Sequence, residues 1–202
     1  MFCYNHVSLL RLQLTDTLSM TTQAAIKGFM TGLSIALLSS TAGASTFNIG
    51  INNDTLDLGL KSTLSATSQF TANYLYVEDQ GKALDLGWLT VNNTGGNRIA
   101  IGGKILKLWS EQRDNGHLLA LGGDIRMPIT PGLSAAIAGY AAPAVLSSSG
   151  IKRYYSIDAK LLYQLMPTAD LYLGYRDVAF KFDNQPDQTL DQSFYLGAEV
   201  TF

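Results

Sequence analysis

His117 is the candidate general base of this chain, because the other histidine, His6, lies close to its start. Ser110 and Glu111 come shortly before it, and a serine, a histidine and an acid in contact would form the nucleophile system of a hydrolase. No serine stands in a G-x-S-x-G element, however. We therefore expect an exposed loop histidine and no enzyme. Lipid extracts that are identical with and without His117 would support this expectation.

Metal, cofactor and nucleic-acid chemistry find no support in the composition. The chain has one cysteine, Cys3, and two histidines, too few for a site of the Cys₂His₂ type. Its 14 basic and 16 acidic residues give a net charge of −2, without the basic excess that nucleic-acid binding requires. We predict no metal, no cofactor and no nucleic-acid partner.

Eight charged residues lie in segments where apolar residues recur at every second position, and each of the eight occupies a position between the apolar ones. Successive side chains of a strand point to opposite faces, so these charges lie opposite the apolar row. The set holds four acidic and four basic residues: Asp85, Lys104, Asp124, Arg126, Asp158, Lys160, Arg176 and Glu199. In a membrane barrel they would line the lumen, whereas in a soluble barrel they would form the solvated outer face.

The balance of opposite charges predicts ion pairs across the lumen. Barrels of about eight strands are filled by side chains, and porins of about 16–18 strands hold a channel. Pairing in a narrow barrel would plug it, which favours a structural or interaction barrel. A small channel for ions or solutes, with these charges tuning its selectivity, is the alternative. A lipid-modifying enzyme is a second alternative.

The elements that must position these charges are strands separated by frequent turn signals. We expect ten, or eight if the hairpin around Asn53 and Asp54 is frayed: 46–53, 56–64, 70–77, 83–91, 97–109, 117–127, 133–142, 152–164, 170–181 and 192–202. Connections alternate between a compact set (65–69, 92–96, 128–132 and 166–169) and a more polar set that includes longer members. This alternation predicts an all-β, antiparallel up-and-down barrel that crosses a membrane, with the compact turns in the periplasm.

The last strand shows the alternation most clearly. Its apolar positions are Phe194, Leu196, Ala198, Val200 and Phe202. An exposed apolar edge strand would aggregate, so we expect it to close the barrel by pairing with the strand near Phe47. Glu199 would point into the lumen toward basic partners such as Arg176. The ending on Phe202 also resembles the C-terminal signature that the outer-membrane assembly machinery recognises.

Residues 20–44 have the pattern of a secretory signal peptide. Lys27 precedes an apolar run over 28–38, too short for a membrane span, and Ala42 and Ala44 complete a small-x-small cleavage site. We expect cleavage after Ala44 and a single barrel domain over 45–202. Residues 1–19 fit a leader poorly and are either a start-site artefact before Met20 or an extension of the leader.

Aromatic residues favour a membrane barrel over a soluble periplasmic barrel that binds an apolar ligand. Aromatic side chains form girdles at membrane interfaces. Those that lie mostly toward strand ends are Tyr74, Tyr76, Trp88, Trp109, Tyr140, Tyr154, Tyr155, Tyr163, Tyr172, Tyr175 and Phe182. Heat-modifiable gel mobility and carbonate-resistant pelleting would separate the two cases.

Four segments resemble the YfaZ family of predicted outer-membrane proteins of Gram-negative bacteria. They are Gly102-Gly103-Lys104, Leu121-Gly122-Gly123-Asp124, the run over 140–151 and Leu173-Gly174-Tyr175-Arg176. The tyrosine-rich stretch of the family is reduced here to Ala138-Gly139-Tyr140. The resemblance implies an outer-membrane barrel and brings no reaction or substrate. The expected partners are outer-membrane lipid and the assembly machinery, and we expect a monomer.

Overall fold

The computed structural model describes residues 44–112, 114–148, 150–183 and 186–202. The predicted signal peptide lies outside this part of the chain except for Ala44, which is exposed and precedes the first strand. The strands are β1 (Ser45–Ile51), β2 (Thr55–Ser65), β3 (Ser68–Val77), β4 (Gly81–Thr94), β5 (Asn97–Ser110), β6 (Gly116–Thr130), β7 (Leu133–Pro143), β8 (Ile151–Met166), β9 (Ala169–Phe182) and β10 (Gln188–Thr201). A short 3₁₀ turn, η1 (Ala144–Leu146), follows β7. The prediction of ten strands is confirmed.

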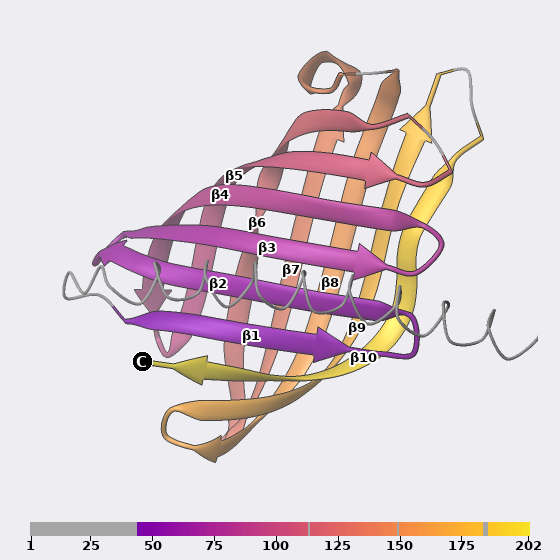
Figure 1. Ribbon diagram of the computed structural model, residues 1–202. Helices are drawn as coiled ribbons and strands as arrows, with labels where there is room; N and C mark the ends of the chain where they lie inside the picture. Colours follow the sequence, from indigo (N-terminus) through magenta and orange to yellow (C-terminus); the bar gives the residue numbers. More distant parts are fainter. Residues whose placement is uncertain (1–43, 113, 149, 184–185) are drawn as a thin grey trace, which may run out of the picture. The chain divides into compact units, whose positions relative to one another are not determined.

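Each strand pairs antiparallel with its neighbour in sequence, and the sheet closes between β1 and β10. Figure 1 shows β10, in yellow, beside β1, in indigo. Phe47 lies opposite Val200, and Ile49 lies opposite Ala198. The backbones of Ser45 and Phe202 exchange two hydrogen bonds of 2.8 Å at the end of this seam. The last strand is therefore the closing strand, as its alternation predicted.

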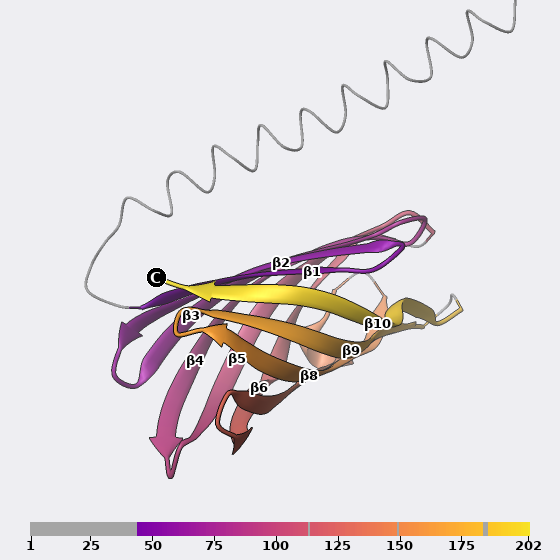
Figure 2. The same ribbon diagram turned by 90° about the horizontal axis from the view of Figure 1, so that it is seen from below.

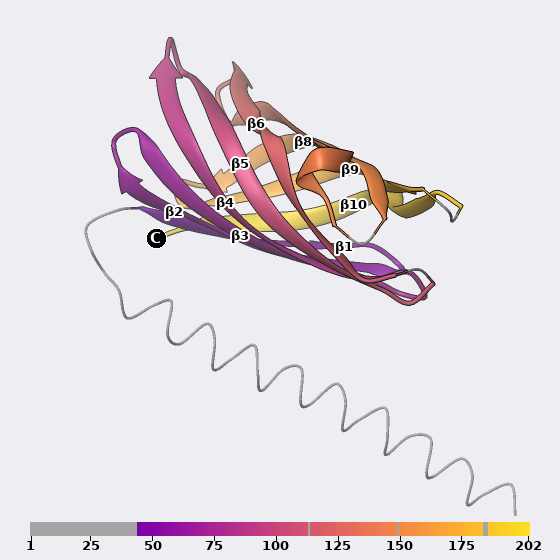
Figure 3. The same cartoon turned by 90° about the horizontal axis from the view of Figure 1, so that it is seen from above.

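The two ends of the barrel differ in their connections. Two residues join β2 to β3, β4 to β5, β6 to β7 and β8 to β9. These turns lie at the end that also holds Ser45 and Phe202, which we call the turn end. The other connections and η1 lie at the opposite end, the loop end (Figures 2 and 3). In the β4–β5 turn, Gly95 and Gly96 have φ of 62° and 83°, as two-residue hairpin turns of type I′ require.

The outer face of the barrel is apolar and the inner face is charged. Ile101, Ile105 and Phe194 each expose about two thirds of their surface, whereas Asp57 and Arg176 are buried inside. This is the reverse of a soluble barrel and is the arrangement of a membrane barrel. No helix among the described residues has the length and apolar character needed to cross a membrane.

The expectation of aromatic girdles was wrong in part. Tyr76, Trp88 and Tyr163 are exposed on the outer face. Four others are turned inward, and three of these are buried: Tyr140, Tyr154, Tyr172 and Phe182. In their strands the odd-numbered residues face lipid, and the even-numbered residues, which include Tyr140, Tyr154 and Tyr172, face the lumen. The direction of these side chains therefore depends on their place in the alternation and not on their nearness to a strand end.

Candidate functional site

Apolar side chains pack against one another in the loop-end half of the lumen. They come from the loop-end segments of β3 to β10, and we call them the apolar plug: Leu75, Val77, Ala83, Leu106, Leu108, Leu118, Ala120, Ala142, Ile151, Tyr154, Val178, Phe180, Phe182 and Leu190. Leu108 and Phe180 have no exposed surface, and the rings of Tyr154 and Phe180 lie 5.0 Å apart. A passage through the barrel would have to displace these side chains.

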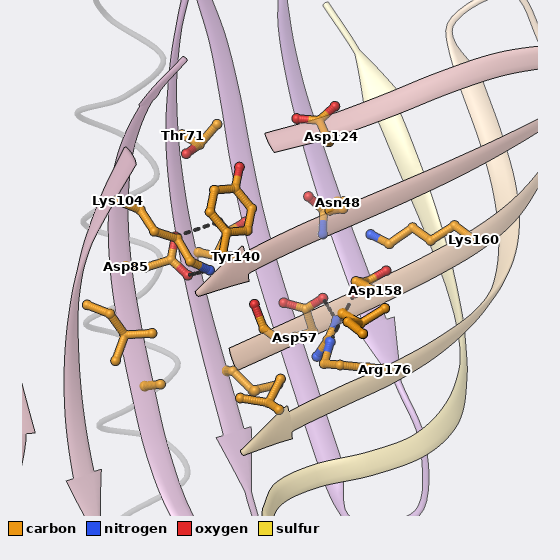
Figure 4. Close-up of a pocket in the computed structure, with 18 of the residues that line it drawn as sticks. Asn48, Asp57, Thr71, Asp85, Lys104, Asp124, Tyr140, Asp158, Lys160 and Arg176 are labelled. Atoms are coloured by element: carbon orange, nitrogen blue, oxygen red, sulfur yellow. Dashed lines mark hydrogen bonds and ion pairs between the residues drawn. The ribbon is translucent and has the colours of Figure 1, made fainter. Parts of the chain in front are cut away.

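Below the plug, Arg176 of β9 is the centre of a buried ion network. Its guanidinium contacts Asp57 of β2, Asp158 of β8 at 3.0 Å and Asp191 of β10 at 3.8 Å. Tyr195 donates a hydrogen bond of 2.7 Å to Asp158, and its ring packs under the guanidinium. We call these five residues the Arg176 network. Figure 4 shows Asp57, Asp158 and Arg176 converging inside the barrel.

A second group of paired charges lies on the wall formed by β3, β4 and β5. The Lys104 ammonium is 3.1 Å from the Asp85 carboxylate, which also accepts a hydrogen bond of 2.8 Å from Asn73. The same ammonium lies 4.5 Å from the centre of the Tyr140 ring, a cation–π contact (Figure 4). Each charge of this group is thus satisfied by a neighbour.

Two arginines pair with acids at the turn end. Arg126 of β6 reaches across the lumen to Asp170 of β9 and Glu199 of β10. Arg98 of β5 pairs with Asp124 and donates a hydrogen bond to the Gln69 side chain. Both contacts of Arg126 join distant strands, so they hold the mouth of the barrel together.

The paired charges leave two cavities. One, of about 160 Å³, lies between the apolar plug and the turn end and is lined in part by Asn48, Lys61 and Lys160. The other, of about 250 Å³, lies at the turn-end mouth beside Arg126 and Gln164. Both are on the turn-end side of the plug and are polar enough to hold water.

A family model described as YfaZ precursor matches residues 26–202 of this sequence. The chain belongs to the YfaZ family. The family resemblance predicted from the sequence is thereby confirmed. The word precursor in the description accords with an exported YfaZ protein, although the cleavage position after Ala44 stays a prediction.

Solved structures similar to this YfaZ chain are remote. A structure described as the KdgM porin in complex with disordered oligogalacturonate has 9% identity and a TM-score of 0.47, and the match covers 79% of this chain and 99% of that one. A structure described as a de novo design of transmembrane β-barrels has 14% identity and a TM-score of 0.34, with 79% and 95% covered. Comparison with curated proteins gives no significant match.

The eight charges singled out from the sequence all lie on the inner side of the YfaZ barrel. Six of them line the cavity of about 160 Å³ between the apolar plug and the turn end: Asp85, Lys104, Asp124, Asp158, Lys160 and Arg176. Arg126 and Glu199 pair with each other near the turn end. The suggested pairing of Glu199 with Arg176 was wrong, because Arg176 lies opposite Ser193 in the register, six residues along β10 from Glu199.

Several inner charges of the YfaZ barrel were missed. They are Asp57, Lys61, Arg98, Asp170 and Asp191. All except Asp191 fall within the predicted strands and have the parity of the eight, so the same rule would have found them. Asp191 was missed because β10 begins four residues earlier than its alternation indicated, with an irregularity between Thr189 and Asp191.

The structure does not assemble a hydrolase cluster around His117. His117 is exposed, and its backbone N–H and C=O both bond to the Ser148 side chain. The Ser110 hydroxyl donates instead to Gln188 of β10 at 2.9 Å. These contacts tie the loop end together.

Glycines make room for the tyrosine rings of the YfaZ lumen, which yields a first prediction. A Cβ added at Gly174 would overlap the buried Tyr195 ring, which lies directly opposite on β10. Gly174→Ala is expected to lower the free energy of unfolding by about 1–3 kcal/mol, because Tyr195 must leave its place under the Arg176 guanidinium. Urea unfolding in lipid vesicles measures the change.

Gly139→Ala is the matched control, since no described heavy atom lies within 4 Å of the added Cβ. Equal stability of the two alanine variants would contradict the role of Gly174.

Proposed function

We propose that the protein is an outer-membrane barrel with a closed lumen and a structural or interaction role. The observation that carries this proposal is the apolar plug, in which Leu108 and Phe180 are fully buried. The paired inner charges support it, because ions bound to each other offer a passing solute no free partner. Membership of the YfaZ family and the apolar outer face support placement in the outer membrane.

The partners proposed for this barrel are membrane lipid and the outer-membrane assembly machinery. The outward row of Phe194, Leu196, Ala198, Val200 and Phe202 supports both roles, because it faces lipid and forms the closing strand. Since closure leaves no free strand edge in the barrel, a monomer is the simplest functional state. We propose no catalytic activity, because the Ser110 hydroxyl donates to Gln188 rather than to His117.

Planar-bilayer recording tests the closed lumen and yields a second prediction. The unmodified protein is expected to give no steady conductance steps. Phe180→Ser, which removes the largest fully buried ring on β9, is expected to produce steps because water enters the loop-end half. Phe194→Ser, on the outer face, is the control and is expected to stay silent.

A small channel is the second candidate function, and the two cavities on the turn-end side of the plug favour it. Steady steps in the unmodified protein that change on replacing Lys104 or Arg126 would establish the channel and overturn the closed lumen.

A further inference from the structure

The outward-facing charges of the barrel are gathered at one end. Along the described strands, outward positions in the turn-end half carry no charged side chain. Near the loop end, outward positions hold mainly basic residues: Lys82, Lys107, His117, Arg153 and Lys181, with Asp177 as the acidic one.

Three of these residues form one continuous patch on β4, β5 and β6, the adjacent strands labelled in Figure 1. Lys82 lies directly opposite Trp109, and Lys107 lies directly opposite His117. The Lys107 ammonium is 5.9 Å from the centre of the Trp109 ring. We call Lys82, Lys107, Trp109 and His117 the rim patch.

The cations of the rim patch are not neutralised by acids of the described chain. Neither Lys82 nor Lys107 forms an ion pair with a described residue, although Glu78, Asp79 and Glu111 lie in the adjoining loops. Elsewhere on the same rim, Lys152 pairs with Asp183 at 3.5 Å and Lys181 pairs with Asp187 at 3.2 Å. The rim patch therefore presents positive charge to an external partner.

The position of the rim patch identifies that partner. Strand β5 shows Ile99, Ile101 and Ile105 to the outside between Asn97 and Lys107. Ten residues of strand span about 33 Å, or about 25 Å across a bilayer at a tilt of about 40°, the height of the apolar band of membrane barrels. Trp109, beside the lysines, is the residue type that marks the membrane–water interface. The lysines thus stand at the level of lipid headgroups.

We propose that the rim patch binds the phosphate of an anionic lipid in the leaflet at the loop end. The two ammonium groups supply charge and hydrogen-bond donors to the phosphate oxygens, and the isoleucines of β5 contact the acyl chains. This inference rests on the proposed placement in a membrane. It adds to that placement a specific lipid contact on one side of the barrel.

Native mass spectrometry of the barrel in maltoside micelles tests the proposal with three probes: phosphatidic acid, phosphatidylcholine and inorganic phosphate. Phosphatidic acid is expected to form adducts, because it offers phosphate together with acyl chains. Lys82→Gln combined with Lys107→Gln is expected to weaken its binding about tenfold or more. Lys152→Gln is the matched control, since this exposed lysine of the same rim is already paired.

Heat-modifiable gel mobility of every variant first establishes that the barrel is folded, and co-pelleting with vesicles separately tests its placement in a membrane. Unchanged phosphatidic acid binding in the double variant would overturn the rim patch. Equal binding of phosphatidylcholine would show that anionic charge is not recognised, and equal binding of inorganic phosphate would show a site for free phosphate; either result overturns the proposal. A folded barrel that fails to enter vesicles would instead contradict the proposed function.

Discussion

Replacing Arg176 with alanine is expected to lower the free energy of unfolding by about 3–5 kcal/mol. The guanidinium is buried and contacts Asp57, Asp158 and Asp191, so its removal leaves three carboxylates inside the barrel without their cation. Burying an uncompensated charge costs far more than an exposed ion pair contributes. Urea unfolding of the vesicle-inserted barrel, followed by tryptophan fluorescence, measures the loss.

Arg153→Ala is the control for this experiment, because Arg153 lies on the outward side of β8 and is exposed. Its loss is expected to change stability by less than about 0.5 kcal/mol. Asp57→Asn in the Arg176→Ala background should recover part of the lost stability, since it removes one of the stranded charges. If Arg176→Ala were as stable as Arg153→Ala, the Arg176 network would not stabilise the barrel.

An arginine placed at the middle of the outer face is expected to be almost as costly. Ile101 is 67% exposed and lies near the midpoint between Asn97 and Lys107 on β5. In a membrane, Ile101→Arg should lower the unfolding free energy by about 2–4 kcal/mol, because the guanidinium would lie in hydrocarbon. Unfolding in vesicles again measures the effect.

Asn97→Arg provides the matched comparison, at the turn-end limit of the same outward row. There the cost should fall to about 0–1 kcal/mol, because the side chain reaches the interface. Equal and negligible costs at both positions would mean that this face meets water rather than lipid.

The alternation of side chains along each strand predicted most of the fold and most of the lumen residues. Apolar residues at alternate positions, as in Ile99, Ile101 and Ile105, define a strand and its lipid side, and the intervening positions then face inward. The same rule holds for Lys104, which stands between Gly103 and Ile105 in the sequence and lines the lumen. Closure follows because the last strand is too apolar on one side to remain an unpaired edge. The choice between ten and eight strands needed the structure, in which β1 and β2 pair over seven residues.

Partner choice inside the lumen could not be predicted in the same way. Which acid meets Arg126 depends on the stagger of strands around the barrel, and the local pattern of β6 holds no information about β9 and β10. The apolar plug was missed for the same reason. Leu108 and Phe180 both point inward, but they lie on separate strands. Only closure of the barrel places them at the same level of the lumen, where they belong to one buried cluster.

The Arg176 network also bears on the order of folding. Asp57 and Arg176 are 119 residues apart, and their strands, β2 and β9, are separated on one side only by β1 and β10. The β1–β10 seam pairs just six residues from each strand, so it is the shortest seam of the sheet. Asp158 and Asp191 lie on the strands that flank β9, so only the Asp57 contact depends on that seam, and this contact then holds the seam together from within. Because this contact forms after the strands have assembled, it slows the unfolding of the finished barrel. It has little effect on the rate at which the strands first assemble.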